Sequence, residues 1–173
     1  VFFIGYLGEK IKAYVPLNYP NIQKKDVVQE VREGLGHAIW LTKDVIPKKS
    51  EVLIVLGDTI IDVDWKKFMQ IKTSVLGVKK VTDPRKFGVV AADANGKIMH
   101  VVEKPSIPKS NMALVGLYKI KEYDTLIKSI DHNIKHNIRS NNEFYLTDAL
   151  QEMIHRGVKL ESFKVDNWYD CGQ

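Results

Sequence analysis

Short, almost wholly apolar runs are the feature of this sequence that most restricts its fold. They occur at residues 1–4, 52–56 and 74–78. A strand that is apolar on both faces belongs in the middle of a sheet, with neighbours on both sides. Predicted helices at 9–14 (ending near Pro16), 37–43 and 64–72, with a further strand at 26–31, separate these runs. The alternation predicts β-α-β units and a mainly parallel sheet with right-handed crossovers.

The second half of the chain predicts a hairpin, two further strands and two longer helices. Asn95-Gly96 lies between the runs 88–92 and 97–102, and this pair favours a tight hairpin turn because both residues tolerate a positive φ. Apolar residues at helical spacing indicate an amphipathic helix over 121–135. A second helix follows, with Thr147 or Asp148 as the expected N-cap. With strands at 113–120 and 159–165, residues 1–173 predict one α/β domain with a mixed, mainly parallel sheet flanked by helices.

The composition disfavours several classes of protein. Of the 173 residues, 45% are hydrophobic and 27% charged, which is ordinary for a globular domain. No apolar run approaches the roughly 18 residues that cross a bilayer. The single cysteine, Cys171, excludes an intramolecular disulfide and a cysteine-cluster zinc site. The net charge of +5 comes from scattered lysine pairs interleaved with acids, unlike a nucleic-acid footprint. A cytoplasmic protein is the simplest interpretation.

Two acidic residues are candidate metal ligands. Asp58 follows the apolar run that ends in Leu56-Gly57, and ligands in open α/β sheets bind beyond the carboxyl ends of the strands. A carboxylate there suits a hard cation such as Mg²⁺. Asp170, within Trp168-Tyr169-Asp170-Cys171-Gly172, is placed to join it. The alternatives are that Asp58 caps a turn and that the aromatic segment is a strand end packed on the core.

Two further stretches are candidate ligand sites. Lys104, in Glu103-Lys104-Pro105 at a predicted strand end, could meet a phosphate as a point charge, or form a solvated pair with Glu103. The segment 29–37 (QEVREGLGH) precedes a predicted helix start, where backbone N–H groups can face an anionic ligand. A Gly-x-Gly of this kind is also common in simple turns.

Eight stretches in order give the sequence a resemblance to the sugar-phosphate nucleotidyltransferases, which include glucose-1-phosphate thymidylyl- and uridylyltransferases and mannose-1-phosphate guanylyltransferases. They are IGYLGEKIKAY (4–14), QEVREGLGHAI (29–39), VLIVLGDTII (52–61), DPRKFGVV (83–90), VVEKP (101–105), ALVGLYKI (113–120), EFYLTDALQEMI (143–154) and NWYDCG (167–172). The resemblance covers nearly the whole chain. It implies a Rossmann-like nucleotide-diphospho-sugar transferase fold.

The resemblance also implies a reaction, in which the phosphate of a sugar 1-phosphate attacks the α-phosphorus of a nucleoside triphosphate and pyrophosphate leaves. Such a transfer depends on positioning and charge neutralisation. By the family motifs, Asp58 and Asp170 would bind the cofactor Mg²⁺. Lys104 would hold the sugar phosphate, and Glu103 would take sugar hydroxyls. No nucleic acid or membrane is implied, and homo-oligomer formation is left open.

The family motifs assign five further residues to substrate binding. Gly88 and Gly116 would let the backbone approach the sugar closely. Gln29 and Gly34 would face the nucleobase, and Thr147 would sit near the sugar pocket. These roles follow from the resemblance alone.

The sequence departs from the family pattern at its N-terminal side. The family's Gly-x-Gly-Thr-Arg-Leu loop, its first strand and its catalytic arginine are absent from the 173 residues. Loops that cradle phosphates need such backbone donors. We therefore expect an incomplete nucleotidyltransferase domain that is inactive alone and belongs to an active parent.

Two other functions stay open at this stage. A non-catalytic regulatory subunit could keep the same fold. A nucleotide-sugar-dependent glycosyltransferase would carry an Asp-x-Asp metal motif, which Asp62-Val63-Asp64 matches in form. Its place at a predicted helix start favours a capping role instead.

Overall fold

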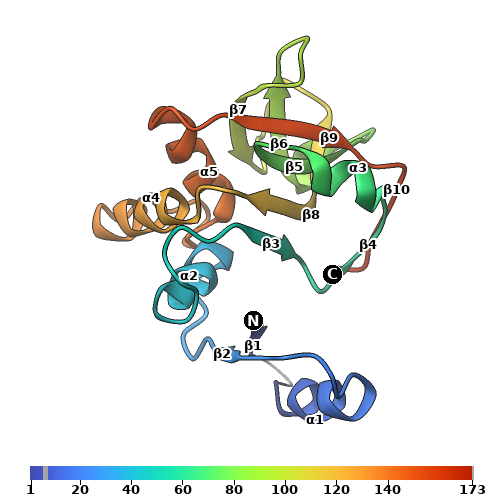
Figure 1. Cartoon of the computed structure of the whole chain (residues 1–173). Coiled ribbons are helices and arrows are strands. Elements are labelled where there is room, and N and C mark those ends of the chain that lie inside the picture. The colour runs from blue at the N-terminus through green and yellow to red at the C-terminus, as the bar shows by residue number, and fades with distance from the viewer. Residues whose placement is uncertain (6–7, 173) are drawn as a thin grey trace.

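The computed structural model describes residues 1–5 and 8–172, and its centre is a six-stranded sheet (Figure 1). The strands are β1 (Phe2–Ile4), β2 (Asp26–Val28), β3 (Val52–Val55), β4 (Thr59–Asp62), β5 (Ser74–Lys80), β6 (Gly88–Ala92), β7 (Ile98–Glu103), β8 (Met112–Ile120), β9 (Leu160–Lys164) and β10 (Asn167–Asp170). The helices are α1 (Gly8–Asn18), α2 (Leu35–Trp40), α3 (Trp65–Gln70), α4 (Tyr123–Lys135) and α5 (Leu146–His155), with 3-10 turns η1 (Leu41–Asp44) and η2 (Pro84–Lys86). Residues 6 and 7, in the first motif stretch, lie outside the described residues.

The mixed α/β class predicted from the sequence is confirmed, but the expected predominance of parallel pairing is wrong for the described strands. Five of their seven pairings are antiparallel, and only β1 with β2 and β5 with β9 are parallel. The reason is the place of β8. It inserts between β3 and β5 and runs antiparallel to both, so β3 and β5, which run in the same direction, do not pair with each other.

The hairpin predicted around Asn95-Gly96 is confirmed. Strands β6 and β7 form the expected hairpin. Its turn is closed by the N–H of Asp93 donating to the carbonyl of Lys97 at 2.9 Å. Gly96 adopts a φ of 81°, a conformation that favours glycine.

Two predicted helix ends are corrected. Helix α1 continues past Pro16 to Asn18. The carbonyl of Lys12, which the missing N–H of Pro16 leaves without its helical donor, accepts instead from Nζ of Lys24 at 3.3 Å. Helix α5 begins at Leu146 after Tyr145 as N-cap, so Thr147 and Asp148 lie inside its first turn and their side chains are free for other partners.

The core lies on both faces of the sheet. One face carries α4 and α5, whose Leu126, Ile130, Leu150 and Met153 are at most 1% exposed. The other face packs Phe68 of α3 against a smaller cluster that includes Val75, Val115 and Leu117. The alternation of side chains along β5 and β8 supplies both clusters.

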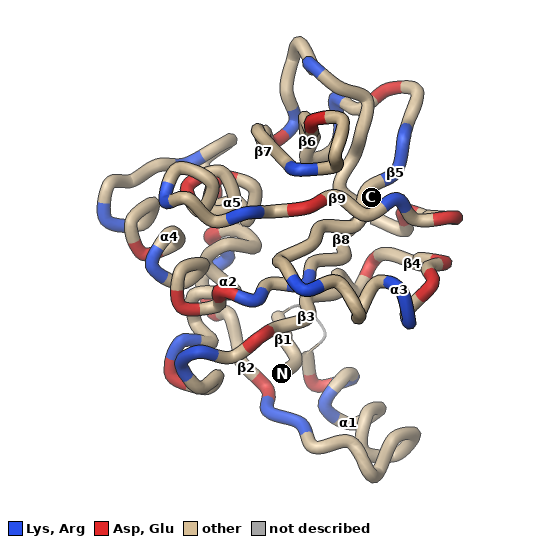
Figure 2. The backbone as a smooth tube through the Cα atoms, turned by 45° about the horizontal axis from the view of Figure 1, so that its top comes forward, with Lys and Arg blue, Asp and Glu red and all other residues tan. Residues whose placement is uncertain are grey.

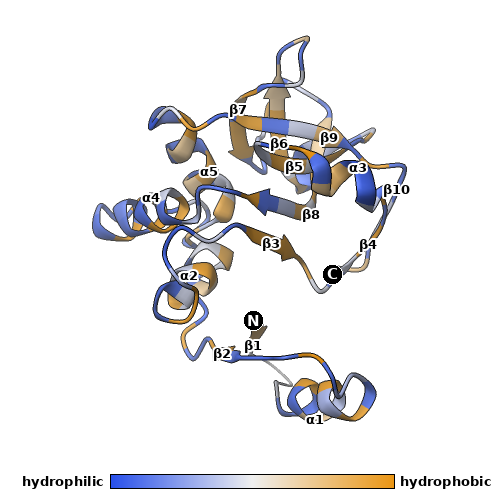
Figure 3. Cartoon of the chain, in the orientation of Figure 1, coloured by the Kyte–Doolittle hydropathy of each residue, from blue (hydrophilic) through white to orange (hydrophobic). Residues whose placement is uncertain are grey.

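Strand β3 is covered less completely than its sequence predicts. Val52 and Ile54 pack on the larger core cluster, whereas Leu53 and Val55 are 44% and 50% exposed. Figure 3 shows hydrophobic colouring along β3. Among the described residues β3 pairs with β8 alone, and β1 pairs with β2 alone, so each of these apolar strands has one open edge.

A bulge in β8 separates β3 from β6 along one edge of that strand. Strand β5 occupies the opposite edge, while β6 pairs with residues 112–113 and β3 with residues 117–120. Between them β8 passes three residues opposite Gly77, because the register shifts between Leu76 and Val78. Gly116 in this bulge has a φ of 80°, and a Cβ there would lie 3.0 Å from the side chain of Leu56.

Charges are dispersed over the fold. Figure 2 shows Lys and Arg interleaved with Asp and Glu along the backbone as a whole. No helix in the described part of the chain combines the length and the apolar character that crossing a membrane requires.

The core assignment predicts that Leu150→Ala lowers the free energy of unfolding by about 2–5 kcal/mol, because it removes a fully buried side chain and leaves a cavity. Leu150 is 0% exposed, and Ile107 is 85% exposed. The control Ile107→Ala should change stability by about 0.5 kcal/mol or less. Urea denaturation of both variants measures the difference, and equal effects would contradict the core assignment.

Candidate active site

A cavity of about 500 Å³ opens at the gap between β3 and β6. Seven of the nine residues that the sequence predicts for the site line it: Asp58, Gly88, Glu103, Lys104, Gly116, Thr147 and Asp170. They come from strands, turns and a helix that are distant in sequence. The β8 bulge and the first turn of α5 bring them to one place.

The carboxylates of Asp58 and Asp170 lie close together. In the antiparallel ribbon of β4 and β10, Asp170 is opposite Thr59, the residue after Asp58. The N–H of Cys171 donates to the carbonyl of Asp58 at 2.8 Å. A Cβ on Gly172 would lie 3.1 Å from Oδ1 of Asp170 and 3.2 Å from Oδ2 of Asp58. The two oxygens are therefore no further apart than the sum of those distances.

This pair has the donor chemistry that Mg²⁺ uses. Mg²⁺ is usually held by one or two carboxylates, with water and substrate phosphates completing an octahedron. Both aspartates are exposed at the cavity. No cluster of three or more His, Cys, Asp or Glu ligands exists among residues 1–5 and 8–172. Asp58 and Asp170 would thus supply the protein ligands, and the remaining ligands would come from water and substrate.

Glu103 forms the opposite, more buried side of the cavity. Its side chain is 9% exposed, and Oγ1 of Thr147 donates to its Oε2 at 2.9 Å. Burial raises the pKa of Glu103, while the Thr147 hydrogen bond and the charge of Lys104 oppose that rise. The result is an oriented carboxyl group with one oxygen held by the protein.

Lys104 is placed by a strained backbone. Its φ is 40°, a left-handed conformation that costs free energy in a residue with a Cβ. Its N–H donates to the carbonyl of Phe87 at 3.0 Å. Its Nζ lies 4.0 Å from Oε1 of Glu103 and 5.5 Å from the centre of the Tyr145 ring. The ammonium is therefore held at the cavity while 44% of the side chain stays exposed.

Gly88 keeps the cavity open beside Glu103. A Cβ at this position would lie 2.8 Å from Cγ2 of Thr147 and 3.0 Å from Cδ1 of Leu114. The first contact is shorter than real Cβ contacts, and the second is tighter than most of them. Any larger residue at position 88 would push on the group that orients Glu103.

Gln29 and Gly34 do not line this cavity, although the structure joins them to each other. Nε2 of Gln29 donates to the carbonyl of Gly34 at 3.1 Å and lies 3.1 Å from Nδ1 of His37. Gly34 has a φ of 97°. The N–H of Gly36 donates to the carbonyl of Phe144 at 2.7 Å, which fixes this segment beside the connection between α4 and α5.

The Asp-x-Asp motif is not part of the cavity. Oδ1 of Asp64 accepts from the N–H of Lys67 at 3.0 Å, so Asp64 is the N-cap of α3, and these backbone and side-chain hydrogen bonds from Lys67 lower its pKa. Oδ2 of Asp62 accepts from Nδ2 of Asn167 at 3.1 Å. The predicted capping role is confirmed.

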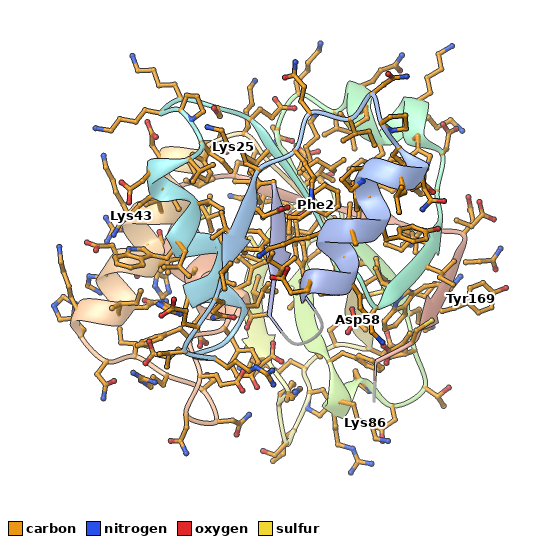
Figure 4. All side chains as sticks on the ribbon, turned by 90° about the horizontal axis from the view of Figure 1, so that it is seen from below. Phe2, Lys25, Lys43, Asp58, Lys86 and Tyr169 are labelled. Atoms are coloured by element: carbon orange, nitrogen blue, oxygen red, sulfur yellow. The ribbon has the colours of Figure 1, made fainter. Side chains whose placement is uncertain are left out.

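Sequence reasoning missed several lining residues. Among them are Leu35, Thr59, Lys86, Phe87, Tyr118 and Tyr145. Thr59 directly follows Asp58, so strand-end adjacency was a usable signal. For Tyr118 the alternation along β8 gave no signal, because a tyrosine at a buried strand position is expected to belong to the core. In Figure 4, Asp58 lies on the same side of the molecule as Lys86 and Tyr169.

Asp148, in the first turn of α5, is an acid whose charge contributes to the raised pKa of Glu103. Oδ1 of Asp148 accepts from Oγ of Ser140 at 3.1 Å, and its buried Oδ2 has no hydrogen-bond partner among the described residues. Burial raises the pKa of Asp148, and the Ser140 hydrogen bond opposes this.

Comparison with known proteins places the chain in a family. The profile of the Nucleotidyl transferase family matches residues 6–173. The chain belongs to this family. The resemblance inferred from the eight sequence stretches is thereby confirmed.

Among characterised relatives, the chain is 34% identical over 174 residues to the bifunctional protein GlmU of Methanocaldococcus jannaschii, covering 98% of this chain and 39% of that protein. It is 31% identical over 160 residues to glucose-1-phosphate thymidylyltransferase of Mycolicibacterium smegmatis, covering 90% of this chain and 51% of that protein. The chain thus spans well under two thirds of these relatives.

Solved structures show the same fold. A crystal structure of UDP-glucose pyrophosphorylase complexed with UDP-glucose matches 97% of this chain and 68% of that chain, with a TM-score of 0.73 and 22% identity. A nucleoside-diphosphate-sugar pyrophosphorylase from Vibrio cholerae matches 98% of this chain and 75% of that chain, with a TM-score of 0.76 and 13% identity. The Rossmann-like nucleotidyltransferase fold is confirmed.

The raised pKa of Glu103 predicts a pH-dependent effect of Glu103→Gln. Burial disfavours the ionised carboxyl, so its contribution to stability is present below the unfolded pKa and is lost as the pH rises through the folded pKa. A neutral amide escapes that loss. The melting temperature of the variant relative to the wild type should therefore rise from pH 4 to pH 8.

Melting curves across this pH range, with the exposed-site variant Glu30→Gln as control, measure the effect. The same difference at every pH would contradict the assignment of Glu103 as a buried, destabilised carboxylate.

Proposed function

We propose that the protein containing this chain transfers a nucleotidyl group from a nucleoside triphosphate to a sugar 1-phosphate. A phosphate oxygen of the sugar 1-phosphate attacks the α-phosphorus, the bond between that phosphorus and the bridging oxygen breaks, and pyrophosphate leaves with the electron pair. The observation that carries the proposal is one cavity with a carboxylate pair, Asp58 and Asp170, on one side and Lys104 with Glu103 on the other. Membership of the nucleotidyl transferase family supports it.

Asp58 and Asp170 are proposed as the ligands of Mg²⁺, the cofactor, which neutralises phosphate charge when bound. Their own contribution is to place two negative carboxylates side by side as cation ligands. Without a cation between them, these carboxylates would repel the charge of a triphosphate. The ribbon of β4 and β10 fixes their separation.

The opposite side of the cavity is proposed to bind the sugar 1-phosphate. Lys104 would neutralise the phosphate, with its ammonium held by Glu103 and the ring of Tyr145. Glu103 would accept from sugar hydroxyls through Oε1, since Oε2 already accepts from Thr147. Gly88 would let the substrate approach the backbone closely.

Three other predicted residues have supporting roles in the proposal. Gly116 permits the β8 bulge that opens the cavity. Gln29 and Gly34, joined by a hydrogen bond, would face the nucleobase. The segment that carries them is anchored at Phe144, so it would stay fixed relative to the sugar side.

We also propose that the parent protein completes this domain with a phosphate-binding glycine loop and an arginine, and that the described chain alone is inactive. The open edges of β1 and β3 and the 39% coverage of GlmU support this. A cytoplasmic location suits the exposed free thiol of Cys171. Pyrophosphate release by the full-length protein, assayed with a panel of triphosphates and sugar 1-phosphates, tests the function, and no release with any pair would contradict it.

The role of Lys104 predicts that Lys104→Ala in the full-length protein weakens sugar 1-phosphate binding about 10- to 150-fold, the range for loss of a charge-assisted contact. Triphosphate binding should change little. Lys104→Arg should restore only part of the affinity, because a planar fork does not reproduce a compact ammonium. Calorimetric titration with each substrate measures these effects.

The matched control is Lys109→Ala, which removes a lysine outside the cavity. Unchanged sugar 1-phosphate binding in Lys104→Ala, together with a large fall in melting temperature, would make Lys104 a structural residue.

A further inference from the structure

The ribbon of β4 and β10 is a separate two-stranded sheet, yet it carries one proposed metal ligand and adjoins the other. Asp58 immediately precedes β4, and Asp170 is the last residue of β10. How the ribbon docks on the central sheet therefore sets where both carboxylates lie. Apolar contacts of Ile61 and Trp168 with the smaller core cluster hold it in place but have little directionality.

A single hydroxyl gives this docking a direction. Oγ1 of Thr59 donates to the carbonyl of Val115 at 2.9 Å, and Nε1 of Trp168 donates to Oγ1 of Thr59 at 2.8 Å. A carbonyl can only accept and an indole N–H can only donate. The hydroxyl of Thr59 between them must do both. The two hydrogen bonds, from Trp168 to Thr59 and from Thr59 to Val115, form a relay whose direction is therefore fixed.

The relay spans all three strands that meet at the carboxylate pair. Thr59 lies on β4, Trp168 on β10, and Val115 in the bulge of β8. Directly opposed residues of an antiparallel pair share a face, and their diagonal neighbours lie within reach of long side chains. Asp170 is directly opposite Thr59, and Trp168 reaches Thr59 along the diagonal.

The same relay extends toward the sugar side of the cavity. The ring of Trp168 meets the ring of Phe87 edge to face, with centroids 4.9 Å apart. Phe87 precedes Gly88 and accepts the backbone N–H of Lys104 through its carbonyl. Trp168 thus touches both walls of the cavity, and its orientation depends on the hydroxyl of Thr59.

We propose that Thr59 is a positioning residue for the metal-binding pair: by bridging Trp168 and the Val115 carbonyl, it fixes the ribbon at the depth at which Asp58 and Asp170 share one cation. This inference rests on the proposed function, because it takes these aspartates as the cation ligands. Thr59 itself does not touch the cation in this role. Groups that orient metal ligands are worth about 10- to 100-fold in metal affinity when they are removed.

The test is Mn²⁺ binding to the full-length protein, followed by electron paramagnetic resonance of the free ion and competed with Mg²⁺. Thr59→Val keeps the shape of the side chain but removes both hydrogen bonds, and it should weaken Mn²⁺ binding by about tenfold or more. Thr59→Ser retains a hydroxyl and should bind Mn²⁺ as the wild type does. Trp168→Phe, which removes the indole N–H and keeps an aromatic ring of smaller size, provides a second variant if Thr59→Val fails to fold.

Thr42→Val is the matched control. Thr42 is a buried threonine whose hydroxyl also makes two hydrogen bonds, to the carbonyl of Ile39 and the hydroxyl of Tyr123. It lies in η1, on the opposite side of the sheet from the ribbon (Figure 1). The control should lower the melting temperature and leave Mn²⁺ affinity unchanged.

Asp170→Asn distinguishes the metal role of the aspartate pair from the positioning role of Thr59. If the wild type binds no Mn²⁺, or if Asp170→Asn binds it equally well, the metal role of the pair is wrong. If Asp170→Asn weakens binding but folded Thr59→Val and Trp168→Phe do not, the metal role stands and the positioning role of Thr59 is overturned. Lowered melting temperature with unchanged Mn²⁺ affinity in both relay variants would make the relay purely structural.

Discussion

The bulge in β8 is the constraint on which the rest of the site depends. A regular strand would pair continuously with one neighbour along this edge and leave no room for a ligand. Because residues 115–117 pass opposite one residue of β5, β6 and β3 take separate parts of the edge. The gap becomes the cavity, and the carbonyl of Val115 is turned toward Thr59. Gly116 tolerates the backbone conformation that this requires.

The sequence alone predicted the element types well and the sheet connectivity poorly. Apolar runs and helical stripes are local signals, so β3, β5 and α4 fall close to their expected ranges. Which strands pair is a tertiary choice, and the insertion of β8 between β3 and β5 has no local signature. The start of α5 was mispredicted for a similar reason: Thr147 resembles an N-cap, but its hydroxyl donates to Glu103, a residue 44 positions away.

The candidate site was predictable to the extent that its residues stand at strand ends in recognisable motifs. Asp58, Lys104 and Asp170 are of this kind, and all three line the cavity. Residues that act through others were not predictable. The adjacency of Thr59 to Asp58 was a signal for its place at the cavity, but its bridging role follows only from the positions of Trp168 and Val115. The left-handed backbone of Lys104 is likewise invisible in sequence, because lysine carries no conformational preference for it.

The pairing of β4 with β10 joins segments that are more than one hundred residues apart in the chain, and this has a consequence for folding. Contacts of such long sequence separation are slow to form, since a large loop must close before they contribute stability. A folding intermediate with the hairpin, β8 and the helices in place would already present Lys104 and Glu103. It would not present two carboxylates side by side until residues 167–170 had docked. Cation affinity would therefore report whether this ribbon has docked.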